Sequence, residues 1–125
     1  MSERANISEA SIGEQLNRIL SSPGFKGSRV LSGFLEFVTR ETLAGREQEI
    51  KEYSIGVQVL FKKMDFNPQL DSIVRIHAGR LRRALNEYYQ TSGNQDPVRI
   101  DIPKGSYVPV FDSHDSDQKA ALPKK

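Results

Sequence analysis

The chain has no cysteine, no tryptophan and only two methionines among its 125 residues. The lack of cysteine excludes disulfide bonds and thiolate metal ligands, and it suits a reducing compartment. No apolar run approaches the ~20 residues that a membrane-spanning helix requires, and the first residues show no apolar signal segment. We therefore expect a cytoplasmic chain without a metal ion, a cofactor or membrane contact.

Excess charge of one sign is also missing. The chain carries 18 Lys and Arg against 16 Asp and Glu, a formal net charge of +2. This balance does not by itself indicate a nucleic-acid partner, but phosphate neutralisation is a local effect. Residues 72–86 contain four arginines and no acidic residue, whereas residues 41–52 contain four glutamates. Basic charge is therefore concentrated in one segment.

Apolar periodicity predicts four helices followed by a β-hairpin. The expected helices cover about 12–20, 28–44, 51–60 and 71–89, and the expected strands cover 98–102 and 107–111. The third helix is ambiguous, because its β-branched residues also favour a strand; its place between two helices favours a helix. We expect a mainly α domain with a C-terminal β-hairpin, 9–111, between a flexible arm, 1–8, and a flexible tail or linker, 112–125.

Local signals suggest where the helices begin and end. Ser8 or Ser11 is available to cap the first helix, and the Ser-Pro-Gly run at 22–24 ends it. The last helix begins either with Asn67 as the cap of a proline-led first turn or with Asp71 as the cap. Three helices followed by a hairpin is the element order of a winged helix-turn-helix, so we expect that fold here with an extra N-terminal helix.

The last helix carries the clearest apolar stripe in the chain, with spacings of four and three residues: Val74, Ala78, Leu81, Leu85 and Tyr88. On the opposite side, about 140° to 240° from Val74 at 100° per residue, lie Ser72, Ile76, Gly79, Arg80, Arg83 and Glu87. Exposed arginines often form only a solvated face. Ordinary exposed helices, however, interleave charges of opposite sign, and neither Arg80 nor Arg82 has a glutamate four residues away.

Such a face suits the major groove of DNA. Arginine bonds bidentately to guanine, and isoleucine contacts a thymine methyl group. A glycine lets the backbone approach closely, and arginine or histidine on the flanks reaches phosphates.

The segment 74–85, VRIHAGRLRRAL, resembles the recognition helix of the OmpR/PhoB-type winged helix-turn-helix, approximately V-D-V-H-I-x-R-L-R-x-x-L. Gly105-Ser106-Tyr107 is similar to the G-x-G-Y wing turn of those domains. Residues 21–111 resemble still more closely the N-terminal winged-helix domains of bacterial multidomain regulators, which precede tetratricopeptide-repeat, TolB-like or cyclase-like portions. The segments 22–25, 51–57 and 71–75 are typical of that group.

The resemblance implies sequence-specific binding of double-stranded DNA by a bacterial transcriptional regulator, with the 71–89 helix in the major groove and the 98–111 wing on the backbone. The implied base contacts, led by Arg80, are Arg75, Ile76, Gly79, Arg80 and Arg83. The implied phosphate contacts are Ser72, His77, Arg82, Arg99, Lys104 and Tyr107.

The chain departs from the family pattern in several places. Arg75 replaces an acidic residue, Gly79 replaces a larger polar or basic one, and Ser106 replaces a glycine. The first two change the readout face, so the operator preference of the family does not transfer. The response-regulator domains also begin with a small antiparallel sheet, whereas this chain is expected to begin with a helix.

A protein-interaction module without DNA readout is the alternative function. The loop before the last helix is expected to expose apolar residues beside charge, namely Phe61, Lys62, Lys63, Met64 and Phe66. The resemblance implies that this loop can face RNA polymerase. Homodimer formation through the 12–20 helix is a further hypothesis, which requires that its apolar face is not covered.

An enzyme is not indicated. His77 and His114 lie far apart, the second within the expected tail. The chain also has no nucleophile elbow and no glycine-rich phosphate loop.

Overall fold

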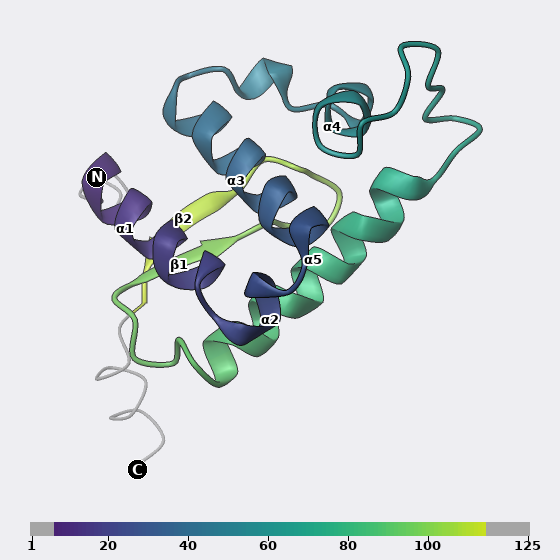
Figure 1. The fold of residues 1–125 in the computed structure, drawn as a ribbon. Coiled ribbons are helices and arrows are strands. Elements are labelled where there is room, and N and C mark those ends of the chain that lie inside the picture. The colour runs from purple at the N-terminus through teal and green to yellow at the C-terminus, as the bar shows by residue number, and fades with distance from the viewer. Residues whose placement is uncertain (1–6, 115–125) are drawn as a thin grey trace.

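The computed structural model describes residues 7–114. Within that range, five α-helices and one 3-10 turn precede a two-stranded antiparallel sheet (Figure 1). The elements are α1 (Glu9–Leu20), α2 (Pro23–Lys26), α3 (Arg29–Leu43), η2 (Glu47–Glu49), α4 (Glu52–Gln58), α5 (Ile73–Gln90), β1 (Val98–Asp101) and β2 (Val110–Ser113). The prediction of a mainly α domain with a C-terminal hairpin is confirmed. No helix in the described range is long and apolar enough to cross a membrane.

The N-terminal helix begins at a serine cap. Of the two candidates, Ser8 is the cap, and its hydroxyl accepts a hydrogen bond from the Ser11 amide at 3.0 Å. Ile7 packs against the core, so the ordered domain starts before residue 9. The expected arm was therefore drawn too long at 1–8, and residues 1–6 lie outside the described range.

Helix α2 was not expected. The Ser-Pro-Gly run at 22–24 does end α1, but Pro23 then occupies the first position of a new four-residue helix. Proline suits that position because its fixed φ is helical and its missing N–H would have no partner there. The reason for the extra turn is Phe25, which is 1% exposed in the core.

Helices α4 and α5 form where the sequence predicts them. The ambiguous third segment is a helix, and the five residues of the predicted stripe on α5 are all buried. Tyr89 is buried as well, which the stripe did not predict. Helix α5 begins at Ile73, whose amide donates to the Asp71 side chain at 3.1 Å. The N-cap position is Ser72, so a start at Asn67 is wrong and Asp71 lies one residue before the cap, although its side chain accepts that bond.

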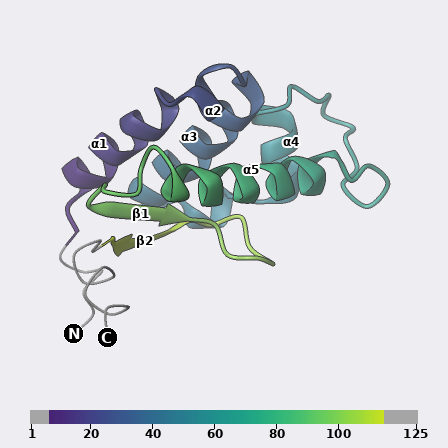
Figure 2. The same ribbon diagram turned by 90° about the horizontal axis from the view of Figure 1, so that it is seen from below.

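The second strand differs from its expected bounds. Val98 faces Ser113 and Asp101 faces Val110, so the second strand is 110–113 and not 107–111. Pro109, directly before that strand, has no N–H with which to extend the pairing. Residues 102–109 instead form a long connection, which Figure 2 shows extending beside the N-terminal half of α5.

The domain also ends later than expected. The His114 ring is 7% exposed, and its Nδ1 lies 2.8 Å from the carbonyl oxygen of Asp96. The amide of His114 donates to the carbonyl of Pro97 at 2.8 Å. The expected tail, 112–125, thus began too early: 112–114 belong to the domain, and 115–125 lie outside the described residues.

A buried polar cluster joins α1 to the end of α5 and to β1. The Asp96 carboxylate accepts hydrogen bonds from the Tyr88 hydroxyl, from Nε2 of Gln15 at 2.9 Å and from Arg18 at 3.2 Å. Burial opposes ionisation of Asp96, but these donors outweigh it and hold its pKa below the usual value. The cluster fixes the C-terminal end of α5 against the rest of the domain.

The Tyr89 hydroxyl bonds to backbone groups of β1 that a third strand would otherwise pair. It accepts a hydrogen bond from the Ile100 amide and donates one to the Val98 carbonyl, both at 2.9 Å. Burial raises the pKa of Tyr89 to about 12. The outer edge of β1 is thereby paired without another strand.

The apolar face of α1 is covered by the chain itself. Ile12, Leu16 and Ile19 are 4%, 1% and 0% exposed, and α1 packs on β1 and α3. The condition for pairing two copies through this face was that it be uncovered, and that condition is not met.

Candidate functional site

The outward side of α5 carries the set of residues that the sequence singled out. Ile76 is 48% exposed, Arg80 and Arg83 are exposed, and Gly79 is partly exposed between them. We call these four residues the arginine face. Because the opposite side of α5 is buried in the core, the face is held on a fixed support.

Arg80 and Arg83 differ from most arginines of the domain in having no carboxylate partner. In the range 7–114, Arg18, Arg40, Arg46, Arg75 and Arg99 all lie within 4.0 Å of a carboxylate oxygen. Arg80 and Arg83 form no such pair in that part of the chain. Two guanidinium groups are thus presented to solvent with their donors uncommitted.

The fold does not require a glycine at position 79. A Cβ added there would meet nothing closer than a guanidinium nitrogen of Arg83 at 3.9 Å, which is ordinary contact. Glycine within a helix costs roughly 0.5–1 kcal/mol relative to alanine. A glycine on the arginine face therefore destabilises the helix without solving a packing problem inside the chain.

Arg75 points away from the arginine face. Its NH1 lies 2.6 Å from the carboxylate of Glu52 and 3.3 Å from the carbonyl of Pro68. Glu52 is the first residue of α4, so the ion pair joins α4 to the first turn of α5. In this state Arg75 is not free to read a base.

Arg82 fastens the 102–109 connection to α5. Its guanidinium donates to the carbonyls of Ile102 at 3.1 Å, Pro103 at 3.3 Å and Ser106 at 2.8 Å. The resemblance implied that the guanidinium of Arg82 contacts DNA phosphates, but its N–H groups are bonded to these three carbonyl oxygens instead. The structure thus gives Arg82 a supporting role that the helical wheel did not reveal.

A groove of about 540 Å³ separates α5 from this connection. Three cationic side chains and a tyrosine are among its lining residues: Arg75, Ala78, Arg82, Lys104, Gly105, Ser106 and Tyr107. Gly105 has φ +84°, a turn conformation that glycine adopts without strain. Of the predicted phosphate contacts, Lys104 and Tyr107 are therefore brought together with the flank of α5.

Tyr107 forms the inner wall of the groove. Its ring lies 6.3 Å from that of Phe34 in the core. Burial raises the pKa of its hydroxyl, and the charge of Glu52 raises it further. Tyr107 is therefore neutral at physiological pH and available as a hydrogen-bond donor.

Ser72 and His77 lie at the N-terminal end of α5. Ser72 is exposed at the cap position and makes no side-chain cap bond. His77 is partly buried, and desolvation together with the charge of Arg80 lowers its pKa. A neutral His77 donates one hydrogen bond but adds no positive charge.

Arg99 is not brought to the groove. Its guanidinium lies 4.7 Å from the ring centroid of Tyr89, near the C-terminal end of α5, and 3.8 Å from Asp101. The arginine face and Lys104 are thus assembled without it.

The loop between α4 and α5 exposes apolar side chains, as expected. Phe61 is 75% exposed and Met64 is 81% exposed. Lys63 is exposed, and Lys62 forms an ion pair with Asp71 at 3.1 Å. Leu70 is 86% exposed beside them, which the sequence interpretation missed.

Phe66 does not belong to this exposed set. It is 9% exposed, with its ring on Gly56 and stacked on Tyr53. The expectation that Phe66 faces a partner is therefore wrong, because its ring anchors the loop to α4.

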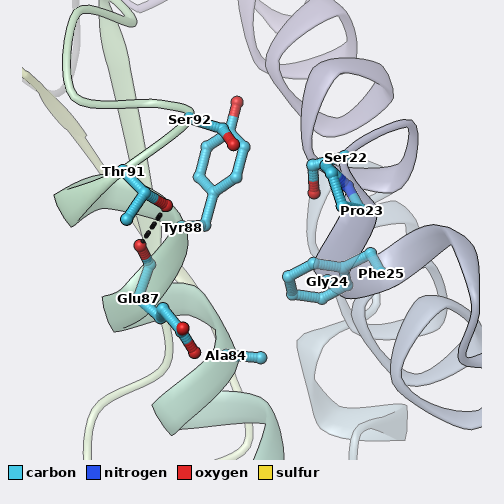
Figure 3. Close-up of a pocket in the computed structure, with 9 residues that line it drawn as sticks. All are labelled: Ser22, Pro23, Gly24, Phe25, Ala84, Glu87, Tyr88, Thr91 and Ser92. Carbon is cyan, nitrogen blue, oxygen red and sulfur yellow. Dashed lines mark hydrogen bonds between the residues drawn. The ribbon is translucent and has the colours of Figure 1, made fainter.

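A smaller cleft of about 340 Å³ lies between α2 and the C-terminal end of α5 (Figure 3). Phe25 and Tyr88 face it from either side, and Glu87 is its one ionisable carboxylate. None of the predicted site residues lines it. Nor does the described part of the chain contain a cluster of three or more His, Asp or Glu that would hold a metal ion.

Glu52 is a neighbour of a candidate site residue that sequence reasoning missed. It was counted among the acidic residues of 41–52, and no local pattern connects it to Arg75, 23 residues later. Only the packing of α4 on α5 brings the two side chains together.

Comparison with known proteins adds no relative. No protein-family model matches the chain, and no curated protein or solved structure matches it.

Proposed function

We propose that the chain is the DNA-binding domain of a bacterial transcriptional regulator, built as a winged helix-turn-helix and acting in the cytoplasm. Helices α4 and α5 form the helix-turn-helix, and the 102–109 connection is the wing. The observation that carries the proposal is the arginine face, where two unpaired guanidinium groups flank an exposed Ile and a glycine that the fold does not need.

Each part of the surface has a role in this proposal. α5 lies in the major groove, where Arg80 and Arg83 bond to guanine edges and Ile76 contacts a thymine methyl group. Gly79 lets the helix backbone approach the bases. Lys104 and Tyr107 on the wing contact phosphates and fix the register of the helix along the duplex.

The small net charge of +2 is compatible with this role. Phosphates respond to the charges nearest them, because free charges are screened beyond about 8 Å at physiological salt. The four glutamates of 41–52 lie on other elements, with the exception that Glu52 reaches α5.

Binding to a pool of random-sequence duplexes, followed by fluorescence anisotropy at several salt concentrations, tests the proposal. The wild-type protein is expected to bind with an affinity that falls steeply with salt. Arg80→Ala is expected to weaken binding. Arg40→Ala removes an equal charge from an exposed position on α3 and is expected to change little. Absence of binding by folded wild-type protein, even at low salt, would rule out the proposed function.

One observation favours a second candidate, a protein-interaction module whose partner is RNA polymerase or a regulatory protein. Three apolar side chains on the α4–α5 loop are at least 75% exposed: Phe61, Met64 and Leu70. If this is the principal activity, Met64→Ser abolishes partner binding while Arg80→Ala leaves it unchanged. DNA binding that Arg80→Ala weakens and Met64→Ser leaves unchanged supports DNA readout instead.

A further inference from the structure

The Glu52–Arg75 ion pair lies beside the groove between α5 and the wing. Arg75 lines this groove together with Arg82 and Lys104. Tyr107 lines the same groove, and burial followed by the charge of Glu52 raises the pKa of its hydroxyl. An acidic group is thus paired with one of the three cationic side chains that line this groove.

Both members of the ion pair are restrained by their surroundings. The Glu52 side chain is only 20% exposed, and Arg75 donates a second bond to the Pro68 carbonyl. A DNA phosphate that approaches Arg75 must also approach the Glu52 carboxylate, and the like charges repel. Arg75 therefore contributes little net attraction for a phosphate while the pair is intact.

We propose that Glu52 is a specificity-determining residue, which acts by withholding Arg75 from the DNA backbone. The inference rests on the proposed function. Non-specific affinity comes from phosphate neutralisation, whereas discrimination comes from base contacts. By cancelling one cation on the flank of α5, Glu52 lowers the affinity for arbitrary duplex and leaves recognition to the arginine face.

The test compares wild type, Glu52→Gln, Arg75→Ala and the double variant on one duplex without a selected site. Glu52→Gln removes the charge at nearly constant shape and frees Arg75 for a phosphate. Its plot of log affinity against log salt is expected to steepen by about 0.9, the value of one neutralised phosphate. Between 50 and 200 mM salt, this adds a further affinity loss of about 3.5-fold.

The double variant separates this mechanism from a simple change of net charge. In the Arg75→Ala background, Glu52→Gln is expected to leave the slope unchanged, because there is no guanidinium to release. Glu87→Gln is the control, since it removes a carboxylate from an exposed position on α5, the helix that carries Arg75. Its effect is expected to be the same with and without Arg75.

The outcomes are distinguishable. An unchanged slope in Glu52→Gln, or a steepening that persists without Arg75, overturns the role of Glu52 while DNA binding stands. If folded wild-type protein binds no duplex at low salt, the proposed function is wrong, and the role of Glu52 is wrong as well because it rests on that function. Circular dichroism on each variant confirms that the fold is retained, and a merely structural salt bridge would change the melting temperature without changing the salt slope.

Discussion

The ring of Phe66 packs directly on the backbone of Gly56. A Cβ at position 56 would lie 2.3 Å from Cε2 of that ring, closer than real atoms approach. The same ring stacks on Tyr53, with centroids 6.3 Å apart. Phe66 on the loop that leads into α5 is therefore fastened to α4 by Gly56 and Tyr53.

Gly56→Ala is expected to destabilise the domain by about 1–3 kcal/mol, the usual cost of forcing extra volume into a packed site. The Phe66 ring has to move, and Tyr53 limits that movement. Urea unfolding measures the change. Gly33→Ala on α3 is the control, because its Cβ would meet only Val59 at 3.8 Å. Equal effects of the two substitutions would show that the Phe66 contact is unimportant.

Gly79→Ala is expected to raise the free energy of unfolding by roughly 0.5–1 kcal/mol, because alanine is the better helix former and has room. At the same time it is expected to weaken DNA binding, since the new methyl group projects from the arginine face. Thermal unfolding and anisotropy on the same samples provide both readouts.

Gly13→Ala is the matched control for that substitution. Gly13 lies within α1, and a Cβ there would meet no atom within 4 Å. The control is expected to gain similar stability with unchanged DNA binding. If Gly79→Ala stabilised the protein and bound DNA as well as Gly13→Ala does, close approach at position 79 would be excluded.

Arg82→Ala is expected to cost about 1.5 kcal/mol of stability, the lower end for hydrogen bonds to a charged group, because the side chain is partly exposed. Three wing carbonyls lose their donor. Arg82→Lys is expected to rescue little, because an ammonium group does not reproduce the guanidinium fork. Amide hydrogen exchange should increase at 102–108 first. Unchanged exchange there would contradict the supporting role.

Acid pH is expected to destabilise the domain partly through Asp96. Its folded pKa lies below the unfolded value of 3.8. Its stabilisation is therefore complete above that value and is lost as the pH falls through the folded pKa. Asp96→Asn should be less stable at neutral pH and should show a shallower loss of stability below pH 3.8. A wild-type dependence of stability on pH in Asp96→Asn would contradict this role.

The sequence predicted the features that depend on local signals. The 4-3 spacing located the buried stripe of α5, and it also placed Arg80 and Arg83 on the exposed side. Gly105 was likewise placed in a turn, and it has φ +84° there.

The features that were missed depend on partners distant in the chain. The register of β2 is determined by its pairing with β1, so alternation alone misplaced the strand. Phe66 read as an exposed loop residue because nothing nearby indicates that Gly56 accepts its ring. The hydrogen bonds from Arg82 to the carbonyls of Ile102 and Ser106 could not be predicted for the same reason, because these partners lie 20 and 24 residues away.

Selection of bound sequences from the random duplex pool, done in parallel with wild type and Arg80→Ala, tests the central claim most directly. Wild type is expected to enrich a defined site. Arg80→Ala should lose the preference at one base pair of this site, and its binding free energy for the site should fall by ~1–3 kcal/mol. Lys104→Ala should weaken all sequences about equally. Failure of the wild-type protein to enrich any sequence, or an identical site from Arg80→Ala at unchanged affinity, would contradict readout by the arginine face.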